Sequence, residues 1–326
     1  MAAVLPDPAT TARGSPFDLE DDATHRRWRD WKLAHRAPDA DALTVDVADP
    51  RSLSRAERDA LHARIAHANM ALYRSPLTSE DKTLPRALGA QLGLHRLDAN
   101  WLADEDGISS IAVSDRSDGH TAGRGGFIPY TDRAIRWHTD GYYHPQQRRI
   151  HAMILHCVRA AAQGGANALL DHELAYIALR DASPDHIHAL MQPDAMTIPA
   201  REDSDGVARP AQTGPVFSVD AQGRLHMRYT ARTRSIEWKA DSATRAAVAC
   251  LEALLASDSP WIIRTRLHAG MGFVGHNVLH ERSAFADDPA RPRLLYRARF
   301  LDRVALAAMG NDDTPAPSAE APWRNG

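Results

Sequence analysis

A histidine and an aspartate stand two positions apart in the segment Trp137-His138-Thr139-Asp140-Gly141. On a β-strand, residues i and i+2 face the same side, so the side chains of His138 and Asp140 could bind one metal ion. An imidazole and a carboxylate are two of the three ligands of the 2-His-1-carboxylate triad, which leaves open positions on Fe(II). Because the chain has 17 histidines, a His-x-Asp pattern by itself is weak evidence.

A second imidazole would have to come from a distant segment. The stretch from Gly275 to Phe285 contains His276 and His280, which share a strand parity, so spacing alone does not choose between them. His268 is a third and weaker candidate. The competing interpretation of each residue is a core or surface histidine that binds no metal.

A third segment, residues 293–300, alternates basic and apolar side chains. On a strand, Arg293, Arg297 and Arg299 share one face, and the residues between them form an apolar face. A guanidinium makes a bidentate, charge-assisted pair with a carboxylate, so such a face suits a pocket for an acid. The alternative is a solvated surface, because the chain has only three lysines among its 39 basic residues and arginine is common throughout.

Composition excludes several classes of protein. The 326 residues are 44% hydrophobic and 25% charged, as in ordinary globular proteins, and the formal net charge of -3 gives no general attraction for nucleic acid or an anionic membrane. Two cysteines, Cys157 and Cys250, exclude a disulfide scaffold. No apolar run reaches the roughly 18 residues of a membrane span, and no secretory signal is evident. We therefore expect a cytoplasmic protein.

The elements that must position these groups are mostly short strands. Strands are predicted at residues 108–114, 135–143, 150–159, 168–170, 195–198, 216–219, 225–229, 261–267, 273–280 and 293–301. Helices are predicted at residues 23–35, 54–73, 79–94, 174–180 and 242–256. The glycine-rich stretch 114–126 is a candidate lid. Together they predict a mainly β fold, a sandwich or barrel with helical decoration.

The three segments together resemble the taurine dioxygenase-like family of Fe(II)- and 2-oxoglutarate-dependent oxygenases. The family pattern has a Trp-His-x-Asp motif, a distal Leu-His-Gly-Arg-x-Ala-Phe segment and a downstream arginine. The resemblance spans roughly residues 108–302 and favours His280 as the second imidazole, although Glu281 replaces the usual glycine. The matching residues are Trp137, His138, Asp140, Leu279, His280, Arg282, Ala284, Phe285 and Arg293.

This resemblance implies a double-stranded β-helix, or jelly roll, of the cupin-like kind. It implies Fe(II) bound by His138, Asp140 and His280, with 2-oxoglutarate as co-substrate and O2 as oxidant. Arg293 would hold the far carboxylate of 2-oxoglutarate, with Arg297 as a further contact. Asn167 occupies the position at which the family has a threonine that helps to bind 2-oxoglutarate.

The expected organisation is a loose arm (1–20), a helical part (21–107), a catalytic core with a helical insertion (108–305) and a disordered tail (306–326). The implied reaction is hydroxylation or oxidative cleavage, in which 2-oxoglutarate becomes succinate and CO2. We expect a small anionic or zwitterionic substrate near Tyr142, Arg228 and Arg232, with Arg234 a further candidate, and a possible homo-oligomer. The alternatives are a metalloenzyme that does not use 2-oxoglutarate and a non-catalytic binding protein.

Overall fold

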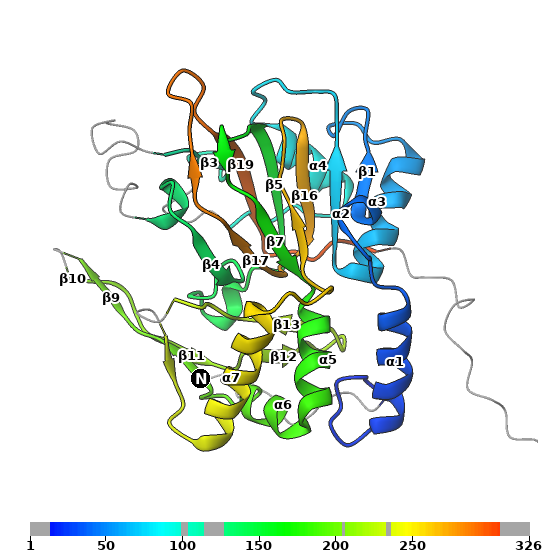
Figure 1. The fold of residues 1–326 in the computed structure, drawn as a ribbon, viewed down its shortest axis with the longest axis vertical. Helices are drawn as coiled ribbons and strands as arrows, with labels where there is room; N and C mark the ends of the chain where they lie inside the picture. Colours follow the sequence, from blue (N-terminus) through cyan, green and yellow to red (C-terminus); the bar gives the residue numbers. More distant parts are fainter. Residues whose placement is uncertain (1–13, 99–103, 114–126, 204–205, 233–235, 307–326) are drawn as a thin grey trace, which may run out of the picture.

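Two β-sheets form the centre of the computed structural model, which describes residues 14–98, 104–113, 127–203, 206–232 and 236–306 (Figure 1). The larger sheet has six strands in the order β1-β2-β16-β5-β19-β3. These strands are β1 (Thr44–Asp46), β2 (Met70–Arg74), β16 (Met271–His276), β5 (Ala152–Arg159), β19 (Leu294–Phe300) and β3 (Ser109–Ile111). All neighbours pair antiparallel except the parallel pair β1 and β2.

The second sheet has four antiparallel strands in the order β15-β7-β17-β4. Its strands are β15 (Ile263–Thr265), β7 (Asn167–Leu170), β17 (Leu279–Arg282) and β4 (Ile135–His138). The two sheets pack against each other, because Met153 and Phe273 of the larger sheet share one core cluster with Leu169 and Ile263 of the smaller. Inward-facing strand residues therefore meet in the space between the sheets.

Two helices cover the outer face of the larger sheet. Leu61 and Ile65 of α3 (Arg55–Ala68) and Leu88 of α4 (Leu84–Gln91) share a core cluster with Ile154 of β5 and Phe300 of β19. Successive residues of a strand point to opposite faces, so β5 contributes Ile154 to this outer core and Met153 to the inner one. The larger sheet is consequently buried on both faces.

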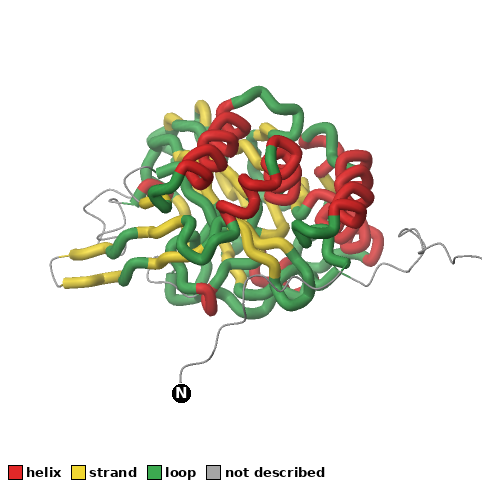
Figure 2. Tube along the Cα trace, turned by 90° about the horizontal axis from the view of Figure 1, so that it is seen from below, coloured by secondary structure: helices red, strands yellow, loops and turns green. Residues whose placement is uncertain are grey.

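A third core lies below the two sheets in the view of Figure 1, where α1 (Asp22–Ala34), α5 (His172–Ala182), α6 (Pro184–Leu190) and α7 (Ser242–Ala256) gather. One further sheet has three strands: β11 (Gln212–Gly214), β8 (Met196–Ile198) and β14 (Glu237–Trp238). Two-stranded sheets are formed by β12 (Phe217–Val219) with β13 (Leu225–Met227), by β9 (Arg201–Asp203) with β10 (Gly206–Arg209), and by β6 (Gln163–Gly164) with β18 (Phe285–Ala286). The hairpin β9–β10 projects from the body (Figure 2). Short helical turns complete the chain at α2 (Ala40–Leu43), Ile128–Tyr130 and Gln146–Arg148.

The helix predicted over residues 54–73 is wrong at its C-terminal end. Ser54 and Glu57 form the expected capping box at its start, but the helix ends at Ala68. Asn69 then adopts a left-handed conformation (φ 59°), and the chain continues as β2. Tertiary pairing decides the outcome here, because the apolar run after Asn69 fills a position between β1 and β16.

The strand predicted over residues 273–280 is two strands in two different sheets. β16 ends at His276 in the larger sheet, and β17 begins at Leu279 in the smaller. The two histidines at issue therefore do not share a strand, and the parity argument that left them equivalent is wrong.

Several predictions fall partly or wholly outside the described residues. The candidate lid (114–126) is not described, and neither is the tail beyond residue 306. Of the expected loose arm, residues 14–20 are described, and Phe17 is buried against Trp28 and Tyr176. Within the described ranges, no helix is both long and apolar enough to cross a bilayer.

Helix α1 is fixed to α5 by a buried ion pair, so we predict that replacing Lys32 destabilises the protein. The ammonium group of Lys32 lies 2.7 Å from Asp171 and 2.5 Å from Glu173, and its side chain is 1% exposed. In Lys32→Met, two carboxylates lose their buried partner, which costs about 3–5 kcal/mol in the free energy of unfolding measured with urea. Lys239→Met, which breaks the more exposed pair with Asp194, should cost less than about 1 kcal/mol. Equal losses in the two variants would contradict this prediction.

Candidate metal centre and adjoining cavity

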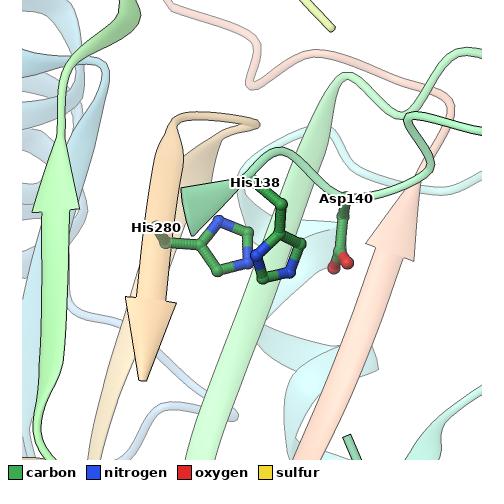
Figure 3. A group of neighbouring side chains, drawn as sticks. All are labelled: His138, Asp140 and His280. Atoms are coloured by element: carbon green, nitrogen blue, oxygen red, sulfur yellow. The ribbon is translucent and has the colours of Figure 1, made fainter. Parts of the chain in front are cut away.

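Three side chains converge at one end of the smaller sheet, two of them from neighbouring strands and one from the turn after β4 (Figure 3). His138 is the last residue of β4, and His280 of β17 is its direct partner in the strand register. The two imidazole centroids are 4.2 Å apart. One potential ligand atom from each of His138, Asp140 and His280 lies within 4.8 Å of the others. This spacing suits three ligands about 2 Å from a shared ion.

Asp140 reaches this cluster by a different route from the one predicted. The expected strand over residues 135–143 ends at His138, and Asp140 lies in the turn that follows. Gly141 makes this turn possible, because its φ is 66° and a Cβ there would lie 2.5 Å from Ile150 and 2.7 Å from His144. The carboxylate is thus positioned by a tight turn rather than by strand parity.

The main chain fixes the orientation of both imidazoles. Nδ1 of His138 lies 2.9 Å from the carbonyl oxygen of Arg136, and Nδ1 of His280 lies 3.0 Å from that of Val278. A carbonyl only accepts, so Nδ1 carries the proton in each ring and Nε2 keeps its lone pair for a metal. Burial, with a contribution from His280, lowers the pKa of His138 to about 3. Burial also lowers the pKa of His280, so both rings are neutral.

Asp140 is a buried carboxylate with one oxygen free. Arg297 donates to its Oδ1 at 3.1 Å, whereas its Oδ2 has no hydrogen-bond partner among the described residues. Burial raises the pKa of Asp140, but the charges of Arg297 and Arg299 outweigh that effect and hold it well below its usual range. The carboxylate is therefore ionised, and one of its oxygens is available to a cation.

The two other candidate histidines lie elsewhere. His276 is buried at the end of β16, and its Nδ1 is 2.8 Å from the side-chain oxygen of Asn69. His268 is exposed in the loop after β15. The structure thus brings His280, and neither of these, to His138 and Asp140.

A cavity between the two sheets adjoins the cluster. Apolar side chains form much of its lining, and its polar lining residues include His138, His280, Asn167, Arg293 and Arg297. Arg293 is 5% exposed, its guanidinium lies 4.9 Å from the centre of the Phe285 ring, and it has no hydrogen-bond acceptor among the described residues. Nδ2 of Asn167 is likewise buried without a partner. Two unpaired donors in a cavity beside a carboxylate-and-histidine cluster fit a bound anion.

Arg293, directly before β19, and Arg297 and Arg299 within it differ in their partners, and the alternative of a solvated arginine face is wrong. All three are buried, while Leu294, Tyr296, Ala298 and Phe300 pack into the outer core as the alternation predicts. Arg297 pairs with Asp140, and Arg299 pairs with Asp98 at 2.7 Å and with the hydroxyl of Tyr143 at 3.0 Å. Arg293 alone keeps its guanidinium free for a ligand.

The predicted substrate residues divide into two groups. Thr230 forms a β-bridge with His138. The hydroxyl of Tyr142 interacts with Thr230 and with the exposed Arg232. Tyr142, Thr230 and Arg232 therefore lie beside the candidate metal ligands. Arg228 is buried, and its guanidinium donates to the carbonyls of Met196, Gly214 and Gln212. This geometry favours a structural role for Arg228 over the predicted substrate contact. Arg234 lies outside the described residues.

Sequence reasoning missed two groups that hold the loop after the metal motif. Asn277 bonds with Asp140 and Ile150 through its side chain, and Asp98 accepts from Arg299, His144 (3.1 Å) and Arg148 (2.6 Å). Asn277 stands three residues before His280, and that proximity was the only available signal. Asp98 had none, because these three partners are 46 to 201 residues away in sequence.

The Asp98 network predicts an acid-sensitive contribution to stability. Burial raises the pKa of Asp98, but the hydrogen bond from His144 and the charge of Arg299 lower it to about 2. A carboxylate with a lowered folded-state pKa stabilises the fold above its unfolded value and loses this effect as the pH falls towards the folded value. The difference in unfolding free energy between wild type and Asp98→Asn should therefore shrink by roughly 2 kcal/mol from pH 6 to pH 2.

The matched control is Asp59→Asn, because Asp59 is exposed on α3 and lies 3.5 Å from Arg55. Its difference from wild type should stay small at every pH. Urea unfolding followed at several pH values measures both variants. A difference for Asp98→Asn that stays constant over this range would show that the carboxylate carries no such contribution.

Solved structures share this fold. A non-haem iron oxygenase, OrfP, in complex with Fe and alpha-ketoglutaric acid superposes with a TM-score of 0.55 at 16% identity, covering 91% of this chain and 92% of that one. An asparagine oxygenase in complex with Fe(II), 2S,3S-3-hydroxyasparagine and succinate superposes with a TM-score of 0.54 at 18% identity, covering 90% and 87%. The strand-rich, helix-decorated architecture is therefore that of known iron oxygenases.

Sequence relatives are more similar but are matched over shorter segments. A uridine-5'-phosphate dioxygenase from Amycolatopsis sp is 35% identical over 173 residues, which cover 51% of this chain and 60% of the relative. A protein of the same name from Streptomyces sp is 34% identical over 178 residues, covering 52% and 62%. The chain thus spans about 60% of the length of these relatives. The model of the taurine catabolism dioxygenase TauD, TfdA family matches residues 32–299, and the chain belongs to this family.

Proposed function

We propose that the protein is an Fe(II)- and 2-oxoglutarate-dependent dioxygenase that hydroxylates or oxidatively cleaves a small anionic molecule. The observation that carries this proposal is the adjacency of two sites: the cluster of His138, Asp140 and His280, and the free guanidinium of Arg293 in the cavity beside it. We also infer that the two facing sheets form a double-stranded β-helix with the cluster between them. Family membership and the iron-oxygenase fold support both inferences.

The donor set fits Fe(II). Two neutral imidazoles and one ionised carboxylate form the 2-His-1-carboxylate triad, which leaves positions open for a co-substrate and an oxidant. Nε2 of His138, Nε2 of His280 and the free Oδ2 of Asp140 are the atoms that would hold the ion. The hydrogen bonds at Nδ1 of both rings fix their tautomers, and Arg297 orients the carboxylate.

The cavity fits 2-oxoglutarate, a dicarboxylate whose keto acid end can chelate a metal. Arg293 would bind the far carboxylate, and the amide of Asn167 would donate to it in place of the threonine hydroxyl of the family. Arg282 does not compete for this role, because its guanidinium donates to the carbonyls of Thr131 and Arg133. Bound together, Fe(II), 2-oxoglutarate and O2 supply the oxidising chemistry, and the chain supplies binding, orientation and charge.

The residues that we expect to contact the substrate favour an anionic molecule. Tyr142 and the exposed Arg232 lie beside Thr230, which pairs with the metal-cluster residue His138. Burial raises the pKa of Tyr142, so its phenol stays neutral and can donate a hydrogen bond. Arg232 can pair with a phosphate, sulfonate or carboxylate. The names of the two relatives make uridine-5'-phosphate the first substrate to test.

The first test is anaerobic binding of Fe(II) and 2-oxoglutarate. We expect the weak visible charge-transfer band of the chelate in wild type and its loss in His138→Ala. In Arg293→Ala, the Kd for 2-oxoglutarate should rise by roughly 30-fold or more, since truncating one partner of a buried charge pair costs at least about 2 kcal/mol. His268→Ala and Arg291→Ala are the matched controls, because both residues are exposed and lie outside the cavity.

These variants also separate the alternatives. A metal-dependent signal without any effect of 2-oxoglutarate would identify a metalloenzyme that does not use this co-substrate. The absence of metal binding in wild type would favour a non-catalytic binding role, and either result would overturn the proposal.

The second test concerns the substrate. With O2 admitted, succinate release should rise on addition of uridine-5'-phosphate and remain lower with uridine, which lacks the phosphate. Arg232→Ala should raise KM for the anion more than it lowers kcat, because it removes a binding contact away from the reacting atoms. Arg245→Ala, on the exposed side of α7, is the control. Equal stimulation by uridine and its phosphate would contradict an anion subsite at Arg232.

A further inference from the structure

The carboxylate ligand lies beyond the end of its strand, so something other than the sheet must hold it. β4 ends at His138, and Asp140 occupies the turn that begins the loop of residues 139–151. Strand pairing fixes His138 and His280 directly, through their register. A loop residue without such support would have many accessible positions, and a metal site needs its ligands placed to within about 0.5 Å.

Asn277 supplies that support through three side-chain hydrogen bonds. Its Oδ1 accepts from the backbone N–H of Asp140 at 2.8 Å, and its Nδ2 donates to the carbonyl of Asp140 at 2.7 Å. The same Nδ2 donates to the carbonyl of Ile150 at 2.9 Å. The backbone N–H of Asn277 also donates to the carbonyl of His151 at 3.1 Å. Asn277 therefore holds both ends of the loop. Its hydrogen bonds take the place of the strand pairing that Asp140 lacks.

The position of Asn277 in the chain gives these bonds a further consequence. It stands where the chain leaves β16 of the larger sheet and enters β17 of the smaller, three residues before His280. The side chain is 4% exposed, so its three bonds are formed in a dry environment, where losing them is costly. The segment that delivers the second imidazole is thus bonded directly to the segment that delivers the carboxylate.

We propose that Asn277 is the positioning residue of the metal centre, and that it sets metal affinity by holding the carboxylate of Asp140 in place beside His280. It touches neither metal nor substrate and acts through the main chain of Asp140. This inference rests on the proposed function, because it requires that the cluster binds a metal ion.

The test is titration of the whole protein with Co(II), followed by the visible d–d spectrum and by calorimetry. In Asn277→Ala, the Kd for Co(II) should rise roughly 10- to 100-fold, as for other residues that orient metal ligands. Asn277→Asp keeps an acceptor for the N–H of Asp140 but loses both donations to carbonyls, so it should also weaken binding and shift the spectrum. It is the variant to rely on if Asn277→Ala does not fold.

Asn69→Gly is the matched control. Asn69 is also a buried amide (5% exposed), bonded to Asp171 and His276, and its left-handed backbone accepts glycine. It should lose stability to urea while its Kd and Co(II) spectrum stay at wild-type values. A folded Asn277 variant with a Kd within twofold of wild type, or an equal rise in Asn69→Gly, would overturn the inference. No Co(II) binding by wild type would instead overturn the proposed function.

Discussion

The pairing of β17 with β4 is the constraint on which the candidate site depends. It sets His280 directly opposite His138, with the two rings 4.2 Å apart. Side chains alternate across a strand, so a slip of one residue would turn His280 to the other face and remove it from the cluster. The register is secured by burial: Leu279, next to His280, is fully buried in the core below the sheets. The geometry of the imidazoles therefore follows from apolar packing around them.

Three buried arginines carry positive charge in the interior, two of them on β19 and the third, Arg293, directly before it. Arg297 and Arg299 are paired with buried carboxylates, so their cost of burial is offset within the fold. Arg293 is buried without such a partner, and that uncompensated charge is what a bound dicarboxylate would neutralise. A segment that folds with one buried cation left unpaired is organised to bind a ligand. The amide of Asn167, which lines the same cavity, is also unpaired.

The sequence predicted the chemistry better than the geometry. The His-x-Asp pair and the arginine alternation are local signals, and both correspond to residues that meet in the interior. The choice of His280 over His276 required a resemblance, because an apolar run does not show where a chain changes sheets. Asn277 and Asp98 escaped prediction because their partners are distant in sequence and their residue types are common. Arg228 shows the converse, since an arginine near a site can be consumed by main-chain carbonyls.

A crystal structure of the protein with Fe(II), with anomalous scattering recorded at the iron edge, would show whether His138, Asp140 and His280 bind one iron ion. We expect a single strong peak about 2.1 Å from Nε2 of His138 and of His280, with a carboxylate oxygen of Asp140 at a similar distance. A peak bound through Nδ1 of either ring, or one located away from these three residues, would contradict it.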